Sequence, residues 1–403
     1  MKLIRKTLLA SAMIVAASTA QASLSDDKVK IGVLVDMSAG YSDITGKGSV
    51  EAVMMAVEDF GGKVLGKPIE VVVGDTHLKA DVGSSIARRW VEDEQVDVIN
   101  GAVASSVTGA VTKFMTSQEK ITLIAASASH TFTTKDCSPF NAHWTYDVVA
   151  VANGTVKPMV EGGSKKWFFI TADYGFGHAL EKVATGVIKS NGGEVVGGVR
   201  APLGTTDFSS YILQAQSSGA DVIALANAGA DMINALKTAA EFGVTDTAEV
   251  AGLLVFTPGA QALDPAIAGG MKLTTGFYWD MDDQTRAWSK RYMARMDGKI
   301  PSMAHAGTYS STMHYLKAVE ATGTDEGKAV MAQMKATPVE DFFSRNGYLR
   351  KDGRMVHDML QVRIKTASER KNENDIFVIE QIIKGDDAFM KMEDGGCEFA
   401  LAK

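Results

Sequence analysis

Short apolar runs of strand length alternate with amphipathic stretches in the first part of the chain. The runs are almost wholly apolar, which is typical of parallel strands covered by helices on both faces. They occupy residues 28–36, 69–75, 96–102 and 121–127. Between them, residues 46–60 and 80–94 place apolar side chains three or four positions apart, as on one face of a helix. This alternation predicts an α/β fold with a doubly wound sheet.

The same pattern starts afresh after residue 165. A second set of β-branched or aromatic runs predicts strands at 166–171, 194–200, 221–227, 249–256 and 273–280. Helical stretches such as 177–189 and 230–242 separate them. The last predicted strand ends on Phe277, Tyr278 and Trp279. A second sheet of the same kind is therefore expected.

The remainder of the chain carries helices first and short strands afterwards. Helical periodicity covers 283–296, 302–321 and 325–335, and these stretches lack strands of their own, so they must pack on an existing lobe. Strands are expected at 359–365 and 375–383, with a turn at 350–353.

The first 22 residues have the three parts of a cleavable export signal. Lys2, Arg5 and Lys6 precede the apolar stretch Leu8–Ala17, and Ala20-Gln21-Ala22 forms a small-residue cleavage site before Ser23. The uncharged run is too short for a spanning helix, which needs about 20 apolar residues. No Cys follows the cleavage point, so no lipid anchor is expected. The mature protein is predicted to be soluble in the periplasm.

Length and charge narrow the class of protein. Removing 22 of 403 residues leaves 381, which exceeds the roughly 250–300 residues of a single hydrophobic core and indicates two domains. Loss of the three signal charges takes the formal net charge from −7 to −10. An acidic body argues against nucleic acid and anionic lipid as partners.

In an oxidising compartment, the two cysteines, Cys137 and Cys397, are a candidate disulfide, with two free thiols as the alternative.

Motifs for catalysis and cofactors are missing from the sequence. None of the seven His residues forms a metal-binding spacing, no nucleophile elbow occurs, and neither a dinucleotide fingerprint nor a P-loop is found. Triads assembled from distant residues leave no such motif, so an exported enzyme stays open as an alternative. No cofactor or metal is predicted, and a binding protein is favoured over an enzyme.

Loops beyond the carboxyl ends of the strands are the expected ligand site, as in other doubly wound sheets. The loop at Asp36–Asp43 contains Tyr41, and Ser105 is predicted to cap the helix 107–117. For each of these loops, a purely structural role is the alternative. Other loops supply small, hydroxyl or aromatic side chains, which would suit a carboxylate or an apolar ligand. Their candidate residues are Ser106, Ser127, Ala128, Ser129, Tyr174, Asn227, Phe256 and Trp279, with Phe176 and Tyr278 as further aromatic candidates.

At this point the chain resembles a known family, the periplasmic solute-binding proteins of ABC transporters in the branched-chain amino acid-binding (leucine-binding protein) class. Segments spread over the mature chain carry the resemblance, at 30–62, 167–182, 206–231 and 251–256. The resemblance implies a type I periplasmic binding protein fold, with two doubly wound lobes joined by three crossover segments. It also implies capture of one small molecule between the lobes, delivery to an ABC permease in the inner membrane, and a monomer.

The resemblance implies lobe boundaries as well. Lobe 1 would comprise 23–145 and 281–348, and lobe 2 would comprise 146–280 and 349–403. The crossings are expected near His143–Tyr146, Trp279–Asp282 and Gly347–Lys351.

Some of the ligand-binding positions of this family are matched in the sequence, and one is not. Ser105 and Ser127–Ser129 match positions that hold a ligand carboxylate, and Tyr174 matches a second-lobe tyrosine. The acidic residue that holds an α-ammonium should fall within Leu254–Thr257, where the sequence is Leu-Val-Phe-Thr. An unpaired ammonium in a closed cleft would be costly. We therefore expect a carboxylate without an amine, preferably an aromatic acid as in the aromatic-acid-binding subgroup; Tyr41, Phe256 and Trp279 would suit its ring.

Two alternatives remain beside that expectation. One is a branched-chain or other hydrophobic amino acid as the ligand of the same import system. The other, of a different class, is a soluble sensory co-receptor with the same fold that feeds a signalling partner instead of a permease.

Overall fold

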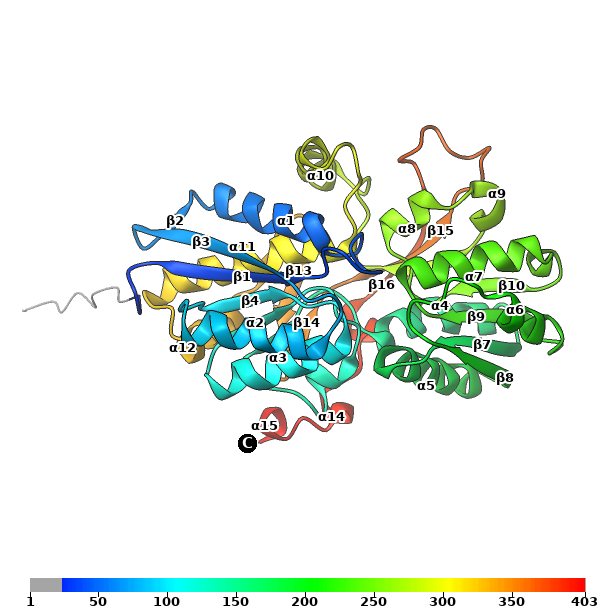
Figure 1. The fold of residues 1–403 in the computed structure, drawn as a ribbon, viewed down its shortest axis with the longest axis horizontal. Helices are drawn as coiled ribbons and strands as arrows, with labels where there is room; N and C mark the ends of the chain where they lie inside the picture. Colours follow the sequence, from blue (N-terminus) through cyan, green and yellow to red (C-terminus); the bar gives the residue numbers. More distant parts are fainter. Residues whose placement is uncertain (1–23, 403) are drawn as a thin grey trace, which may run out of the picture.

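A six-stranded sheet forms the centre of the first lobe in the computed structural model, which describes residues 24–402 (Figure 1). The strand order is β2-β3-β1-β4-β5-β6. All neighbours are parallel except β2 and β3, which form an antiparallel hairpin. The strands are β1 (Val29–Val35), β2 (Lys63–Val64), β3 (Lys67–Asp75), β4 (Val98–Gly101), β5 (Ile121–Ile124) and β6 (Asn141–His143).

Helices cover both faces of this sheet, which explains why its central strands β1, β4 and β5 are almost wholly buried and largely apolar. Leu34 and Ile99 pack against α2 (Ala80–Glu92) and α3 (Ser105–Ser117). Side chains of the opposite face pack against α1 (Gly46–Asp59) and α11 (Met303–Thr322). The late helices α10 (Asp283–Arg295), α11 and α12 (Gly327–Ala336) therefore return to the first lobe, where Arg291 and Arg295 of α10 pair with Asp59 and Glu58.

The second lobe is built on a four-stranded parallel sheet of order β10-β9-β7-β8. Its strands are β7 (Lys166–Ala172), β8 (Glu194–Ala201), β9 (Val222–Ala226) and β10 (Glu249–Gly252). Its helical elements are α4 (Val148–Glu161), α5 (Gly175–Ser190), α6 (Ser209–Gln216), α7 (Gly229–Glu241), η2 (Val244–Asp246), α8 (Thr257–Ala262) and α9 (Pro265–Ala268).

The predicted strand 273–280 is wrong in its second half. β11 (Lys272–Thr275) pairs antiparallel with β15 (Met359–Ile364), which pairs with β16 (Phe377–Ile383) in a separate three-stranded sheet. Phe277, Tyr278 and Trp279 follow β11 in irregular backbone. Phe277 and Tyr278 are buried there, and a buried aromatic segment has the same sequence pattern whether it is a strand or a connection.

Three chain segments pass between the lobes and touch one another. They are Trp144–Asp147, Gly276–Asp282 and His357–Asp358. The ring of His357 lies 2.6 Å from the carbonyl oxygen of Thr145, measured from Nε2. Gly276 is packed so closely that a β-carbon on it would lie 3.1 Å from the His357 ring and 3.5 Å from the Thr145 oxygen. We call these three segments the hinge.

The third crossing lies later in the chain than expected. Residues 347–351 belong to a hairpin of β13 (Arg345–Leu349) and β14 (Met355–Val356), which continues β12 (Val339–Glu340). Arg354 forms an isolated parallel bridge with His143, so this hairpin still adjoins the first lobe. The chain leaves for β15 only afterwards. The exact lobe boundaries stay a prediction.

The tail joins both lobes. After β16 it passes through α13 (Gly385–Ala388), α14 (Met392–Gly395) and α15 (Glu398–Leu401), and the last two of these lie beneath the first lobe in Figure 1. A disulfide connects Cys397, which is fully buried, to Cys137 in the segment between η1 (His130–Thr133) and β6. The tail therefore begins on a second-lobe strand and ends covalently on the first lobe.

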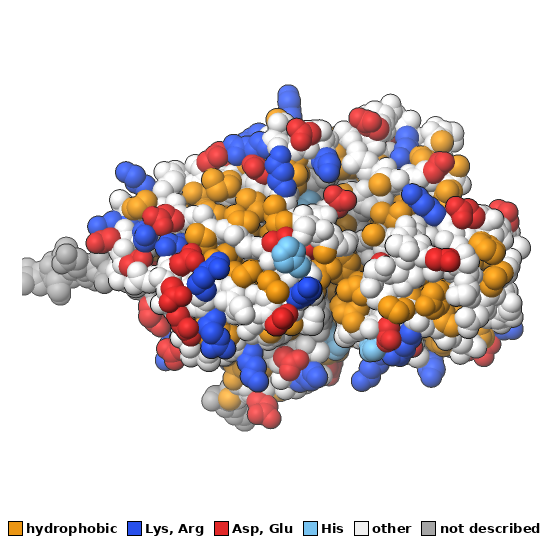
Figure 2. Space-filling view, in the orientation of Figure 1, with side chains coloured by type: hydrophobic (Ala, Val, Ile, Leu, Met, Phe, Trp, Pro, Cys, Tyr) orange, Lys and Arg blue, Asp and Glu red, His pale blue; other side chains and the backbone are white. Residues whose placement is uncertain are grey.

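The surface agrees with an acidic globular protein. On the face seen in Figure 2, acidic and basic side chains are interspersed, and the basic ones form no broad patch among the coloured residues. Among residues 24–402, none of the helices combines the length and the hydropathy needed to cross a membrane. The predicted export signal, residues 1–22, lies outside the described residues.

Candidate ligand-binding site

An apolar slot lies between the lobes at the carboxyl ends of their parallel strands. Both lobes contribute to its lining. The lining residues are Tyr41, Ile44, Val103, Ser105, Ala128, Tyr146, Tyr174, Phe176, Ala228, Leu254 and Phe256. A continuous cluster of buried hydrophobic side chains runs through it from one lobe to the other. This position is where ligands bind in doubly wound folds.

Two carboxylates fix the loop that carries Tyr41. Asp36, which is fully buried at the end of β1, accepts hydrogen bonds from the backbone N–H groups of Ala39 (2.9 Å) and Tyr41 (2.8 Å). Asp75, at the end of β3, accepts bonds from the Met37 N–H and the Ser38 hydroxyl. The loop is thus held at both ends, and the Tyr41 ring is directed into the slot.

Two tyrosines close the slot by meeting across it. The hydroxyl oxygens of Tyr41 and Tyr174 lie 2.6 Å apart. The free volume left is only about 10 Å³, close to the minimum for one water molecule. Burial raises the pKa of both phenols above the ordinary value, so both are neutral and one donates to the other. In this closed arrangement the tyrosine pair occupies the place where a ligand would have to fit.

The serines predicted to hold an anion gather at the first-lobe end of the slot. Ser127 is buried at 1% exposure, and its hydroxyl donates to Ser105 at 3.3 Å. Ser129 accepts a bond from the Thr131 N–H as the cap of η1. Ser106 is exposed and does not line the slot; it lines the neighbouring groove together with Ser105 and Ser129.

The capping role predicted for Ser105 is wrong. Ser105 is the first residue of α3, and the cap position belongs to Ala104, which has no side-chain hydrogen bond to offer. The Ser105 hydroxyl is therefore not engaged by the helix N–H groups. Hydroxyls and free helix N–H groups at this point are suited to a carboxylate.

The second-lobe wall contains buried polar groups without partners. Neither side-chain atom of Asn227 has a hydrogen-bond partner among residues 24–402, although the residue is only 1% exposed. The hydroxyl of Thr257 is in the same state. Asn227 does not itself line the slot, whereas its neighbour Ala228 does. Such groups are rare in folded proteins and are often satisfied by a water or a ligand.

A buried carboxylate stands near the slot at a position that the sequence did not suggest. Asp231, in the first turn of α7, is 5% exposed and, among residues 24–402, accepts one hydrogen bond, from the Gly204 N–H at 3.1 Å. Burial raises its pKa. Burial is the main cause of the raised pKa values of Tyr41 and Tyr174, and the charge of Asp231 makes a smaller contribution to both. Leu254 and Phe256 line the slot with apolar side chains. The segment Leu254–Thr257, where an acidic residue for an α-ammonium was expected, therefore brings no charge to the slot.

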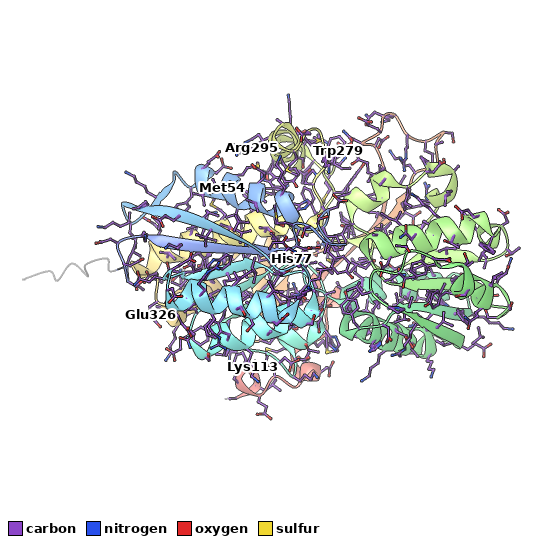
Figure 3. All side chains as sticks on the ribbon, in the orientation of Figure 1. Met54, His77, Lys113, Trp279, Arg295 and Glu326 are labelled. Carbon is purple, nitrogen blue, oxygen red and sulfur yellow. A yellow bond between two sulfur atoms is a disulfide. The ribbon has the colours of Figure 1, made fainter. Side chains whose placement is uncertain are left out.

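Trp279 and Tyr278 do not reach the slot. The indole N–H of Trp279 donates to the carbonyl of Asn374 at 2.9 Å, and the Tyr278 hydroxyl points to the same oxygen. Figure 3 places Trp279 at the lobe boundary near α10. Both rings belong to the hinge and the second-lobe core, because the chain leaves the sheet earlier than predicted. Of the aromatic candidates, Tyr41, Tyr174, Phe176 and Phe256 are the ones brought together.

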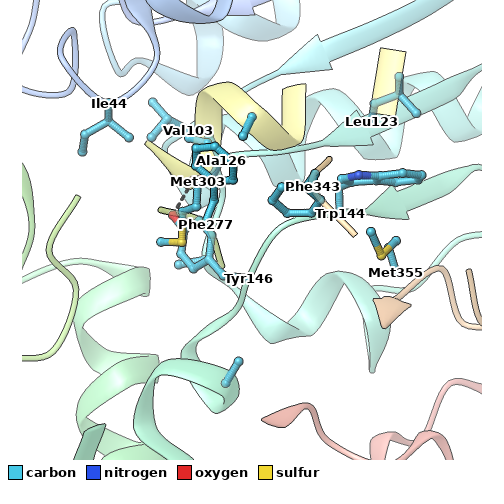
Figure 4. Packing of buried hydrophobic residues seen from close by; sticks show 14 of the residues in the cluster. Ile44, Val103, Leu123, Ala126, Trp144, Tyr146, Phe277, Met303, Phe343 and Met355 are labelled. Carbon is cyan, nitrogen blue, oxygen red and sulfur yellow. Dashed lines mark hydrogen bonds between the residues drawn. The ribbon is translucent and has the colours of Figure 1, made fainter. Parts of the chain in front are cut away.

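Tyr146 is a lining residue that sequence reasoning missed. It sits in the first hinge segment, where its hydroxyl donates to the Ala126 carbonyl at 2.5 Å (Figure 4). Its ring packs edge-on against Phe256, with 5.6 Å between centroids. Ile44 and Val103 were missed as well. For Tyr146, the only signal in the sequence was its place at the first predicted crossing between the lobes. That place did not indicate whether its side chain points into the slot.

A family model described as periplasmic binding protein matches residues 28–371. The chain belongs to the periplasmic binding protein family. A solved periplasmic binding protein from Burkholderia mallei is 44% identical to it, covers 94% of this chain and all of its own, and superposes with a TM-score of 0.91. Leu/Ile/Val-binding protein homolog 6 of Brucella melitensis is 28% identical over 319 residues, which are 76% of this chain and 80% of the relative.

A more distant solved structure shares the fold. It is a solute-binding protein of an ABC transporter from R. palustris in complex with 4-hydroxybenzoate, 21% identical, with a TM-score of 0.80 over 89% of this chain and 98% of its own. The family model and the nearer relatives, among them a branched-chain amino acid ABC transporter ligand-binding protein from Burkholderia xenovorans that is 37% identical, make this periplasmic binding protein an ABC-type substrate-binding protein of the branched-chain amino acid family with the type I fold. Its family and fold are those of extracytoplasmic solute-binding proteins, which bind small molecules and a permease, and not those of enzymes.

Closure of this periplasmic binding protein should depend on Gly229, the first residue of α7. A β-carbon there would lie 2.8 Å from the Gly40 oxygen and 2.9 Å from the Tyr41 ring, across the cleft, and its φ is +60°. We expect Gly229→Ala to disfavour the closed form by about 1–3 kcal/mol, the usual cost of overpacking, because the added β-carbon would be too close to both first-lobe groups only when the cleft is closed. Small-angle scattering should then report a larger radius of gyration.

Gly175→Ala is the matched control. Gly175 is likewise the first residue of a second-lobe helix, α5, but nothing lies within 4 Å of its β-carbon position. An unchanged radius in both variants would contradict the proposed closure contact.

Proposed function

We propose that this protein captures a small organic solute bearing a carboxylate, preferably an aromatic acid, and presents it to an ABC permease for import. One observation carries the proposal. The slot is walled by the rings of five aromatic residues, has the hydroxyl of Ser105 at one end, and has no carboxylate at Leu254–Thr257. The five residues are Tyr41, Tyr146, Tyr174, Phe176 and Phe256.

The chemistry of the walls supports an anion with an apolar body. Aromatic rings provide a large apolar surface and suit the offset or edge-on packing of another ring. Ser105, Ser127 and Ser129 offer hydroxyls, and the N-terminus of α3 offers unpaired N–H groups to a carboxylate. The complex of a distant relative with 4-hydroxybenzoate is in keeping with this class of ligand.

Binding requires the lobes to separate first. The bond between Tyr41 and Tyr174 must break, because the closed slot has almost no free volume. A ligand would enter the open form and rotation at the hinge would then bury it, as in other two-lobed binding proteins. In the complex, the hydroxyls of Tyr41 and Tyr174 would bond to oxygen atoms of the ligand instead of to each other.

Asp231 supports a second candidate, a hydrophobic amino acid. It is a buried carboxylate whose field reaches both tyrosines of the slot, and it could balance an α-ammonium after a modest rearrangement. The name of the Brucella relative, a Leu/Ile/Val-binding protein homolog, is in keeping with this ligand. We place it second because Asp231 already accepts the Gly204 N–H and does not line the slot.

Calorimetric titration separates the two candidates. The ligands are benzoate, 4-hydroxybenzoate, leucine and isoleucine, with the mature wild type and Asp231→Asn. We expect aromatic acids to bind both proteins and to raise Tm by mass action. Tight leucine binding that disappears in Asp231→Asn, with no response to aromatic acids, would overturn the preference for aromatic acids. Chemical conversion of the bound solute would overturn the non-enzymatic class.

A further inference from the structure

A second, larger space opens beside the slot on the side of α3 and α5. This groove has a volume of about 950 Å³ and shares Ser105 with the slot. Its first-lobe wall comprises the start of α3 and the segment Ser129–Asp136; its second-lobe wall is one face of α5. A ligand group placed at Ser105 therefore has room to extend into the groove without leaving the cleft.

Basic side chains from both lobes converge on the groove. His130 and Lys135 come from the first lobe, and Lys182 comes from α5 in the second. Asp136 is the acidic residue that lines the same space. Neither Lys135 nor Lys182 has a carboxylate within ion-pair distance anywhere in residues 24–402, so their charges are available to a ligand.

His130 is the most enclosed of the three. Its Nδ1 atom is buried and makes no hydrogen bond within the described part of the chain. Burial lowers the pKa of this imidazole, and the charges of Lys182 and Lys135 lower it further, whereas Asp147 and Asp136 raise it. Asp147 is engaged elsewhere: it caps α4 and pairs with Arg354.

Two helix N-termini also face the groove. Ser105 and Ser106 begin α3, which has 13 residues, and Gly175 begins α5, which has 16. The free N–H groups and positive ends of both helices favour an anion. Lys135 and Lys182 line the groove from opposite lobes, so an anion between them would compensate their like charges.

We propose that the groove is a subsite for a second acidic group of the ligand, so that the preferred solute is a small dicarboxylate with an apolar or aromatic body. One carboxylate binds at the serines of the slot, and the other lies among His130, Lys135 and Lys182. The inference rests on the proposed function, since it assumes a carboxylate-bearing ligand in the slot.

Calorimetry with matched monoacids and diacids tests this inference at a pH where every carboxyl group is ionised. The probes are benzoate, phthalate and isophthalate. We expect at least one diacid to bind about tenfold or more tightly than benzoate, the size of effect typical of one or two charge-assisted hydrogen bonds. The advantage should shrink as salt is raised.

Variants on one helix supply the control. Lys182→Gln should reduce diacid affinity to that of benzoate while leaving benzoate binding unchanged, because Lys182 is exposed and absent from the slot. Lys189→Gln, on an exposed residue of α5 outside the groove, should retain the full advantage. Benzoate binding with no advantage for any diacid, or an advantage that survives Lys182→Gln, overturns the subsite alone. No binding of any of the three acids overturns the proposed aromatic-acid ligand together with the subsite.

Discussion

Arg354→Met is expected to lower the free energy of unfolding by about 3 kcal/mol, the lower part of the range for removing one member of a buried ion pair. Arg354 is fully buried, and burial lowers its pKa to about 10, which still leaves the guanidinium charged at neutral pH. It lies against the first hinge segment, 3.5 Å from the Asp147 carboxylate and 3.3 Å from the Tyr146 carbonyl. It also lies 4.3 Å from the centroid of the Phe389 ring in the tail.

The expected loss is not at the upper end of that range because Asp147 keeps other partners. Its carboxylate still accepts the N–H groups of Val149 and Ala150, each at 2.9 Å, as the cap of α4. The Arg354 side chain, in contrast, is the group that links a first-lobe hairpin, the hinge and the tail. Methionine preserves an apolar stem of similar length but none of the three attachments.

Urea unfolding followed by circular dichroism measures this effect, with Arg345→Met as the control. Arg345 pairs with Asp282 on the surface, where both side chains are more than two-fifths exposed, and exposed pairs contribute about 0–1 kcal/mol. Equal small losses in the two variants would mean that Arg354 does not hold the hinge together.

Removing the disulfide is expected to cost a similar amount. Cys137→Ser with Cys397→Ser should lower the free energy of unfolding by about 2–5 kcal/mol, because the bridge spans 260 positions and restricts the unfolded chain over a long loop. The tail would then be held by weaker contacts. These include the bond from Asn153 Nδ2 to the Ala388 carbonyl (3.1 Å) and that from Arg350 to the Met390 carbonyl (2.8 Å).

Differential scanning calorimetry under oxidising and reducing conditions tests this prediction. The reduced wild type should unfold at the same temperature as the double serine variant, and the oxidised wild type should unfold well above both. A wild-type Tm that is insensitive to reductant, in a sample where thiol labelling counts two free cysteines, would contradict the stabilising role of the bridge.

Sequence patterns predicted the elements that are regular and covered on both faces. β1, β7 and β9 follow from near-continuous apolar runs, because such runs are typical of strands covered by helices on both faces. The helix periodicity placed α1, α2 and α11 within a few residues of their observed bounds. β6 was missed because Asn141–His143 is short and polar, although all three residues are buried in the structure.

The site was harder to predict, since its geometry depends on contacts between segments far apart in sequence. Tyr41, Ser105, Tyr174 and Phe256 could be found from their places after strands. Trp279 satisfied the same rule but lies in the hinge, because β11 pairs with the distant strand β15 in a separate sheet instead of extending the second-lobe sheet. Asp231 carried no signal at all, since its proximity to Tyr41 and Tyr174 joins residues that are far apart in sequence and, for Tyr41, in different lobes.

The bond between Cys137 and Cys397 has one more consequence, for the topology of the molecule. All three hinge segments and the entire second lobe lie between these two residues, so they form one covalent ring. A protease that cuts once within this ring, for example in the largely exposed loop 366–374, opens the ring but releases no fragment. The nicked molecule keeps its mass until a reductant is added, and the lobes stay joined through every single cleavage of their connections.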